Sequence, residues 1–211
     1  MLTIYSTPLS ANGRKVLAVS RELKLDAVIR LINVYRGEGR SADYLAINPT
    51  GKIPTLVDGD LILYESNAIL PYLCEAHGNY CLWSRDLQAR ARIMRWLFWE
   101  SAHWQPTLTQ ILSSCVGHRL LPKVVPHPGA DPDWGAAELQ GLLKVITTTL
   151  DSSAFLAGDH LTIADFAVAG MVTYFPVAGF RFESHLRFRD WYRCIEATDG
   201  WRATQDPLWA V

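Results

Sequence analysis

The sequence is poor in cysteine, and its four cysteines follow no recognisable pattern. No two of them have the two-residue gap that is typical of dithiol redox motifs and zinc knuckles. Four scattered cysteines in 211 residues are also too few for a disulfide framework. We therefore expect no bound metal and no disulfide exchange by the protein's own thiols.

The sequence also lacks an excess of charge of either sign, and it lacks long apolar runs. The 20 Lys and Arg residues balance 21 Asp and Glu residues, which argues against a dedicated nucleic-acid binder. The uncharged stretch Phe166–Phe180 is shorter than the ~20 apolar residues that cross a bilayer, and Gly170 and Pro176 interrupt it. The first ten residues lack the basic start and apolar block of a secretion signal. We expect a cytoplasmic protein that binds neither nucleic acid nor membrane.

Aromatic residues, by contrast, are abundant. The chain contains 8 Trp, 8 Tyr and 7 Phe, and 49% of its residues are apolar. This composition excludes a disordered chain and supplies a core for one large or two small domains.

The first 78 residues alternate between patterns of strands and helices. Asp58-Gly59 between two short apolar runs is a strong hairpin signal, because Gly tolerates the positive φ that such turns need. Pro71 falls inside the last predicted helix, where it removes one backbone hydrogen bond. The pattern predicts strands at Leu2–Ser6, Ala27–Val34, Pro54–Val57 and Leu61–Tyr64, and helices at Asn12–Lys24 and Ser66–His77.

From residue 86 onward the sequence contains only helical patterns. A long helix begins at Leu87 and should bend at Pro106, and Asp131-Pro132 is typical of a helix start. Thr162-x-x-Asp165 is a capping box that opens another helix, and a further helix spans 185–198. We predict an α/β domain over 1–78 and an all-α domain over 86–211.

Ile53-Pro54 opens a predicted strand directly after the turn at Gly51. A cis peptide is tolerated at such a place, and it would direct the backbone N–H and C=O of Ile53 toward an extended peptide ligand. The alternative is an ordinary trans proline at the start of a strand.

Two predicted helix starts carry polar side chains that suit a small charged ligand. Ser66 could cap its helix, or the same backbone donors could bind a carboxylate while Glu65 accepts an ammonium group. In the loop before the first helix, Ser10 and Asn12 could stabilise a thiolate together with the helix N-terminus. That loop contains no cysteine, so such a thiol must belong to the ligand. Plain helix capping is the alternative at both starts.

An aromatic cluster marks the first long helix of the second domain. Most of its members should be core, but three tryptophans within nine residues exceed what one buried stripe requires. Some of them could line an apolar pocket that faces the first domain. The cluster consists of Trp96, Phe98, Trp99, His103 and Trp104.

Together, the motifs resemble those of a cytosolic glutathione transferase. The resemblance covers essentially the whole chain and is carried by a P-x-S loop, NPTGKIPTL, DGDLILYESNAILPYL and GDHLTIADF. It implies a thioredoxin-like N-terminal domain that holds glutathione, an α-helical domain that contributes the pocket for an electrophile, and a homodimer.

The resemblance also implies roles for individual residues. Glu65 and Ser66 match the pair that holds the γ-glutamyl end of glutathione, and Ile53 matches the residue before the cis proline, Pro54, whose backbone pairs with the cysteinyl unit. Lys52 matches the polar residue before that pair. Arg40 is a candidate partner for the glycyl carboxylate.

Three residues are candidates for contact with the sulfur of glutathione. Ser10 matches the hydroxyl of the serine-type transferases and is the first choice. Asn12-Gly13 resembles a bacterial subgroup in which Asn or Thr contacts the sulfur. Tyr5 matches the strand-end tyrosine of other classes, and we expect it in the core.

The resulting hypothesis is an enzyme that ionises the thiol of glutathione and transfers it to a small hydrophobic electrophile. The electrophile pocket would include Trp99, His103 and Trp104. The alternatives are a transferase-like binding or assembly module without turnover, and a glutathione-dependent peroxidase or dehalogenase.

Overall fold

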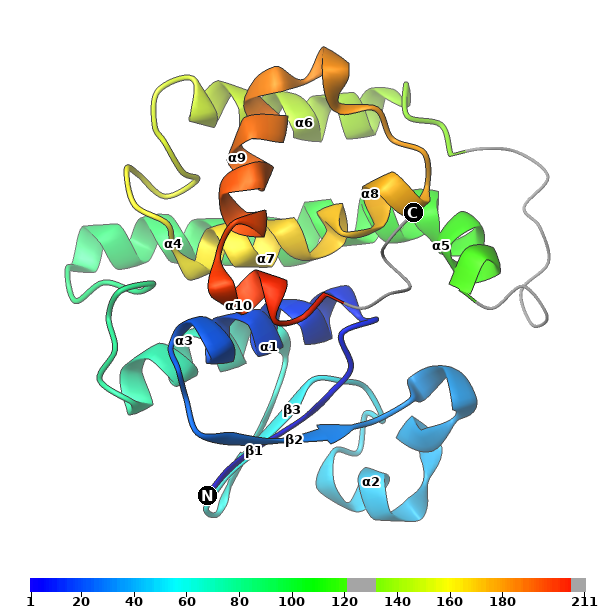
Figure 1. The fold of residues 1–211 in the computed structure, drawn as a ribbon, viewed down its shortest axis with the longest axis vertical. Coiled ribbons are helices and arrows are strands. Elements are labelled where there is room, and N and C mark those ends of the chain that lie inside the picture. The colour runs from blue at the N-terminus through cyan, green and yellow to red at the C-terminus, as the bar shows by residue number, and fades with distance from the viewer. Residues whose placement is uncertain (121–131, 206–211) are drawn as a thin grey trace.

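The computed structural model describes residues 1–120 and 132–205, and it consists of a small sheet under a larger helical layer (Figure 1). Every strand of the described chain lies in the first 64 residues. The expected fold class, an α/β part followed by a helical part, is confirmed.

The sheet contains four strands in the order β2-β1-β3-β4. The first pair, β1 and β2, is parallel, whereas β1–β3 and β3–β4 are antiparallel. Gly59 has a φ of 59° in the turn between β3 and β4, which confirms the hairpin predicted from Asp58-Gly59. The strands are β1 (Leu2–Ser6), β2 (Ala27–Leu31), β3 (Thr55–Asp58) and β4 (Leu61–Tyr64).

The helices of the first part lie on both sides of the sheet. Helices α1 (Ala11–Glu22) and α3 (Ser66–Ala76) lie between the sheet and the helical layer, and α2 (Ala42–Ile47) lies on the far side (Figure 1). The predicted second strand ends earlier than expected, at Leu31, because Asn33 caps a short 3-10 turn, η1 (Val34–Arg36).

The first long helix of the second part, predicted to bend at Pro106, changes its winding just before that residue. Helix α4 (Leu87–Trp99) passes through a π-helical turn, η3 (Glu100–Trp104), into α5 (Gln105–Leu120). The wider turn directly precedes the proline, which cannot donate a backbone hydrogen bond. The remaining elements are α6 (Ala137–Leu150), α7 (Ile163–Val172), α8 (Tyr174–Val177), η4 (Phe182–Ser184), α9 (Leu186–Glu196) and α10 (Asp199–Arg202), and a 3-10 turn, η2 (Glu38–Arg40), belongs to the first part.

Two sequence-based helix boundaries need correction. The helix predicted from Asp131-Pro132 begins only at Ala137, and Asp131 lies outside the described residues. The helix predicted over 185–198 ends already at Glu196, and Asp199 begins a further short helix, α10, because the Thr198 side chain caps a new turn.

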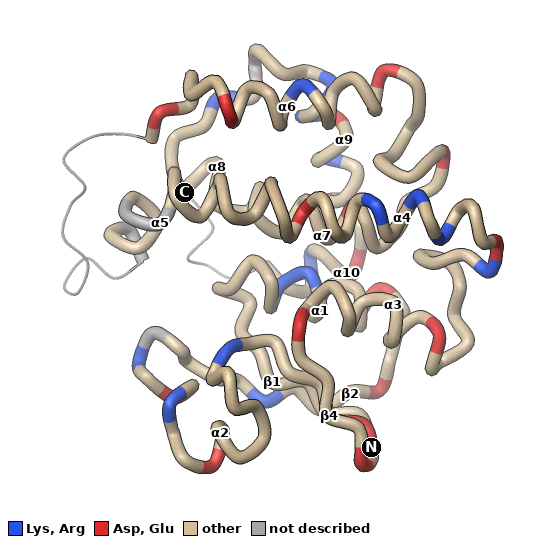
Figure 2. The backbone as a smooth tube through the Cα atoms, turned by 180° about the vertical axis from the view of Figure 1, so that it is seen from behind, with Lys and Arg blue, Asp and Glu red and all other residues tan. Residues whose placement is uncertain are grey.

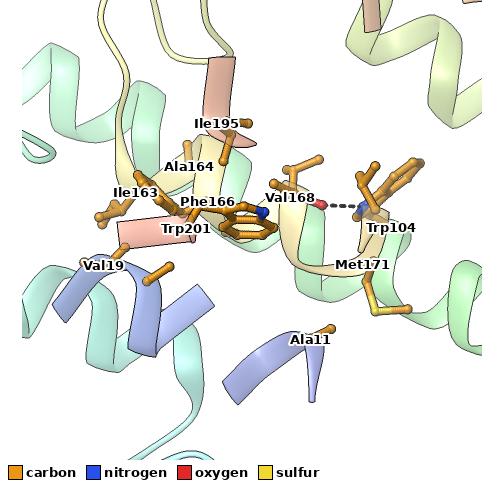
Figure 3. Packing of buried hydrophobic residues seen from close by; sticks show 14 of the residues in the cluster. Ala11, Val19, Trp104, Ile163, Ala164, Phe166, Val168, Met171, Ile195 and Trp201 are labelled. Atoms are coloured by element: carbon orange, nitrogen blue, oxygen red, sulfur yellow. Dashed lines mark hydrogen bonds between the residues drawn. The ribbon is translucent and has the colours of Figure 1, made fainter. Parts of the chain in front are cut away.

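Helix α7 is the centre of the helical layer, and every one of its residues is buried. Its predicted capping box is confirmed: the side chain of Asp165 accepts hydrogen bonds from the backbone N–H of Thr162 and of Leu156. Trp104 donates its indole N–H to the carbonyl of Val168 at 3.0 Å, and Phe166 lies close to Trp201 (Figure 3).

Helix α1 connects the two parts because it packs on the sheet with one face and on α7 and α10 with the other. Two glycines allow this close approach. A Cβ added to Gly200 would lie 2.2 Å from the carbonyl oxygen of Ala18, and one added to Gly170 would lie 3.0 Å from that of Ala11. Both neighbours are backbone atoms that no rotamer change can remove.

We therefore expect Gly200→Ala to lower the free energy of unfolding by about 3 kcal/mol, because α10 must separate from α1. Gly141→Ala, on the exposed face of α6, is the matched control; nothing lies within 4 Å of the new methyl group, and stability should rise by about 0.5–1 kcal/mol. Urea unfolding followed by circular dichroism measures both changes. Equal effects at the two positions would contradict the interpretation of the contact between α1 and α10.

Candidate functional site

A cleft of about 690 Å³ lies between the sheet part and the helices α4 and α5. One wall comes from the starts of α1 and α3 and from the loop before β3; the other comes from α4, η3 and α5. The sequence-predicted residues on its wall are Asn12, Lys52, Ile53, Pro54, Glu65 and Ser66.

The N-termini of α1 and α3 meet in this cleft. The Ser66 hydroxyl donates to Asn12 Oδ1 at 3.2 Å, although the two residues are 54 positions apart in the sequence. Asn12 Nδ2 makes no hydrogen bond to any described residue, so it can donate to a ligand. Two helix N-termini that converge in this way create a region that favours negative charge.

The loop before β3 is held by a network of buried polar side chains. Asn48 is fully buried and donates its side-chain N–H groups to the carbonyl of Lys52 and to the hydroxyl of Thr55, each at 2.9 Å. Tyr44 donates to the same carbonyl at 2.7 Å, and burial raises the pKa of its phenol, which keeps the proton in place. The Ile53–Pro54 peptide is cis. The backbone of Ile53 is thereby presented at the cleft by a rigid support.

Glu65 occupies an unusual backbone conformation at the start of α3. Its φ is 69° and its ψ is 108°, a backbone conformation that residues with a Cβ atom rarely adopt. Glu65, and not Ser66 as the sequence suggested, is the N-cap residue; Ser66 is the first residue of the helix and is buried. The strained backbone directs the exposed Glu65 side chain and the buried Ser66 hydroxyl to the same cleft.

Three further candidates lie away from the wall of the cleft. Ser10 caps α1 by accepting a hydrogen bond from the backbone N–H of Gly13 at 3.2 Å. Tyr5 is half-buried and packs against Tyr44, with 5.9 Å between the ring centres. Arg40 is exposed beside the Gly51 turn, close to Lys52 but outside the lining.

The expected electrophile pocket requires correction. Trp104 is fully buried and bonded to the carbonyl of Val168, so it belongs to the core. Trp99 stacks on Trp104, and His103 is exposed outside the cleft. None of these three residues lines the cleft, although other residues of the same helical segment do.

The residues that line this wall follow a simple spacing. They recur at intervals of four, three and four residues, which is one face of a helix. Such a stripe of mixed polarity, next to an aromatic core stripe, is the signal that could have found them. These residues are Met94, Phe98, Ser101 and Gln105, of which only Phe98 belongs to the aromatic cluster singled out in the sequence.

Comparison with known proteins gives a consistent result. Residues 4–80 match the glutathione S-transferase N-terminal domain, and residues 102–204 match the C-terminal domain of the same family. A probable glutathione S-transferase, GSTF2, from Oryza sativa subsp. japonica is 35% identical over 177 residues, which are 81% of this chain and 80% of that protein. The chain belongs to the glutathione S-transferase family. It is an enzyme of that family with a thioredoxin-like N-terminal domain.

Solved structures of other glutathione transferases share its fold. Glutathione transferase F7 from Populus trichocarpa is 26% identical, with a TM-score of 0.81 and coverage of 97% of both chains. The Bombyx mori enzyme BmGSTD1 is also 26% identical, with a TM-score of 0.80 over 96% of this chain and 95% of its own.

Among the described residues, no group of three or more His, Cys, Asp or Glu side chains could hold a metal ion. No described helix is long and apolar enough to cross a membrane.

The strain at Glu65 makes a testable prediction. Glu65→Gly should raise the free energy of unfolding by about 1 kcal/mol, because glycine adopts a positive φ without a steric penalty. Lys24→Gly, at the other described non-glycine residue with a positive φ (55°), should give a similar gain and is the matched control. Both are measured by chemical denaturation. A loss of stability at Glu65 alone would show that its side chain contributes more than its backbone strain costs.

Proposed function

We propose that this transferase binds glutathione in the cleft between the sheet and α4, and transfers it to a small hydrophobic electrophile. The convergence of the N-termini of α1 and α3, joined by the Asn12–Ser66 hydrogen bond, is the observation that carries this proposal. Two sites that favour negative charge suit a ligand that presents a carboxylate and a thiolate a few bonds apart.

Each part of glutathione has a complementary group in the cleft. The γ-glutamyl carboxylate lies at the start of α3 against Ser66, and its ammonium group faces the Glu65 carboxylate. The cysteinyl unit pairs with the backbone of Ile53 as an added strand. Lys52, with Arg40 at the rim, compensates the glycyl carboxylate.

The thiol lies at the N-terminus of α1. Asn12 lines the cleft and offers an amide donor, whereas Ser10, whose hydroxyl accepts the cap hydrogen bond from Gly13, lies outside the lining. This geometry favours Asn12 over Ser10 as the principal sulfur contact. We accordingly group the protein with the transferases in which an Asn or Ser of this loop, and not a Cys, contacts the sulfur. A hydrogen-bond donor and the helix dipole both stabilise the thiolate and so lower the pKa of the thiol.

The electrophile occupies the wall made by α4 and α5, where Met94 and Phe98 are exposed. The bound thiol first loses its proton to solvent. The sulfur then forms a bond to the electrophilic carbon; in a substitution the leaving group departs with the bonding electron pair, and in an addition the neighbouring atom gains a proton. No covalent enzyme intermediate is needed, because catalysis comes from thiolate stabilisation and positioning.

Calorimetric titration with glutathione, followed by turnover of an activated aromatic halide, tests the proposal. We expect saturable binding below millimolar concentration and release of the halide ion. Binding without turnover of any acceptor would favour a binding module. Turnover of peroxides or of aliphatic halides alone would favour the peroxidase or dehalogenase alternative.

The roles of Asn12 and Ser10 can be separated. Asn12→Ala should raise the pKa of the bound thiol and lower kcat about tenfold, because it removes a donor to the thiolate, and it should also weaken glutathione binding, because Ser66 loses its hydrogen-bond acceptor. Ser10→Ala should instead lower stability by about 1 kcal/mol through loss of the cap, with a smaller effect on kcat. The pH dependence of kcat/KM and thermal unfolding measure the two effects. The reverse pattern would assign the sulfur contact to Ser10.

We further propose a homodimer that buries β4 and the face of α4 that carries Leu87, Met94 and Phe98. Strand β4 is an edge strand that exposes Leu61, Ile62 and Tyr64, and α4 exposes Leu87, Met94 and Phe98 on one face. An apolar edge strand and an apolar helical stripe on both sides of one cleft are typical of an interface. The pocket lining includes Tyr64, Met94 and Phe98, so a second copy would close the cleft.

Ile62→Glu should therefore convert the dimer to monomer, because it adds a charge to the apolar patch on β4. Leu186→Glu on α9 is the matched control: Leu186 is 54% exposed and Ile62 44%, but Leu186 lies on another element. Sedimentation velocity measures the oligomeric state. A wild-type monomer, or a control that dissociates equally, would contradict this interface.

A further inference from the structure

One carboxylate oxygen joins the two helix starts of the cleft to the helical layer. Glu100 is 1% exposed, and its Oε2 accepts hydrogen bonds from Lys15 Nζ at 3.1 Å and from Asn67 Nδ2 at 2.8 Å. Asn67 also donates to the carbonyl of Leu97 at 2.8 Å. Lys15 is itself 1% exposed. The three side chains come from α1, α3 and η3, which are distant in sequence.

The two donors follow the polar groups of the cleft along their helices. Lys15 is buried and follows Asn12 by three residues, which puts it on the same face of α1 one turn later. Asn67 is the neighbour of Ser66 at the start of α3 and lines the cleft beside it. Because both donors bind the same buried oxygen, the separation of the two helix starts is fixed. The Asn12–Ser66 hydrogen bond depends on that separation.

The acceptor is placed by the irregular winding of its helix. Glu100 is the first residue of the π-helical turn η3, where the backbone is wider than in α4. Such turns often occur at functional sites because they redirect a side chain. The same turn contains Ser101 and is followed by Gln105, and both residues lie on the electrophile wall.

Removing only one member of the buried Lys15–Glu100 ion pair is costly for stability. Burial lowers the pKa of Lys15, whereas Glu100 raises it through its charge and its hydrogen bond. Removing one partner leaves the other as an uncompensated buried charge, but replacing both with apolar residues is often neutral for stability. A buried ion pair is therefore better explained by the geometry that it imposes than by its net stability.

We propose that Lys15, Glu100 and Asn67 are positioning residues that hold Asn12 and Ser66 in register for glutathione. The proposal rests on the function proposed above. Lys15 and Glu100 do not line the cleft, so they act through the two helices that the Glu100 oxygen joins; Asn67 lines the cleft and is held by that oxygen. The network also connects the glutathione wall to the electrophile wall, because Glu100 belongs to the latter's helix.

The decisive variant is the double substitution Lys15→Met with Glu100→Leu. It removes both charges at once, so the protein should fold with a Tm close to that of the wild type. Without the shared oxygen, the KM for glutathione should rise about tenfold, and the pKa of the bound thiol should rise by about 1, measured from the ultraviolet absorbance of the thiolate. Glu100→Gln keeps the acceptor and the shape but leaves the buried Lys15 without its counter-charge, so it should lower Tm while the folded protein retains most of the glutathione affinity.

Thr173→Val is the matched control. Thr173 is buried and accepts a hydrogen bond from Arg14, on the side of α1 that faces away from the cleft. It should lower Tm without changing the KM for glutathione or the pKa of the bound thiol. A purely structural network would make the double variant behave like this control.

The outcomes separate this proposal from the function on which it rests. If the wild-type protein does not bind glutathione, the proposed function and the positioning role both fail. If the wild-type protein binds and the double variant keeps the wild-type KM and thiol pKa, only the positioning role is overturned. If the double variant does not fold, Asn67→Ala decides, because it removes one of the two donors without unpairing a buried charge: a wild-type KM and thiol pKa in that folded variant would overturn the positioning role.

Discussion

The burial of α1 on both faces is the constraint on which the rest of the structure depends. The helix must pack on the sheet and also on α7 and α10, although it carries two adjacent cations. Each cation has its own partners. Arg14 donates hydrogen bonds to Thr173 and Thr204, and its guanidinium group lies 4.3 Å from the centre of the Trp201 ring. Lys15 pairs with Glu100. Figure 2 shows the basic segment of α1 enclosed between the sheet and the helices. The N-terminus of α1 is therefore held in one position relative to the sheet and the helical layer.

A fixed helix start is what the stabilisation of a thiolate requires. Preorganised donors stabilise an anion best when they do not have to move, and α1 and α3 present theirs from a rigid base. The support continues in the loop before β3, where Asn48 and Tyr44 hold the carbonyl of Lys52. The strained Glu65 is consistent with this view, since a rigid environment is needed to keep a residue in such a conformation.

The sequence predicted those features whose cause is local. The Asp58-Gly59 hairpin, the capping box at Thr162 and the strand at Leu2–Ser6 depend on neighbouring residues, and all are confirmed. The features that failed depend on tertiary packing. Nothing local distinguishes Trp104, which faces α7, from Phe98, which faces the cleft; the choice is made by where α7 packs. Likewise, Ser10 and Asn12 are both good helix-start residues, and only the position of Ser66 brings Asn12 into the cleft.

The two walls of the cleft differ in how freely they can change. On the glutathione wall, Ser66 and the cis peptide are tied to backbone geometry, so a substitution there alters the support as well as the surface. On the other wall, Met94 and Phe98 are 43% and 67% exposed and contribute little to the core. Substitutions at such positions usually change stability by less than about 0.5 kcal/mol. Under the proposed function, selectivity for the electrophile can therefore vary along this face of α4 with less effect on the fold of a single subunit than a change on the glutathione wall would have.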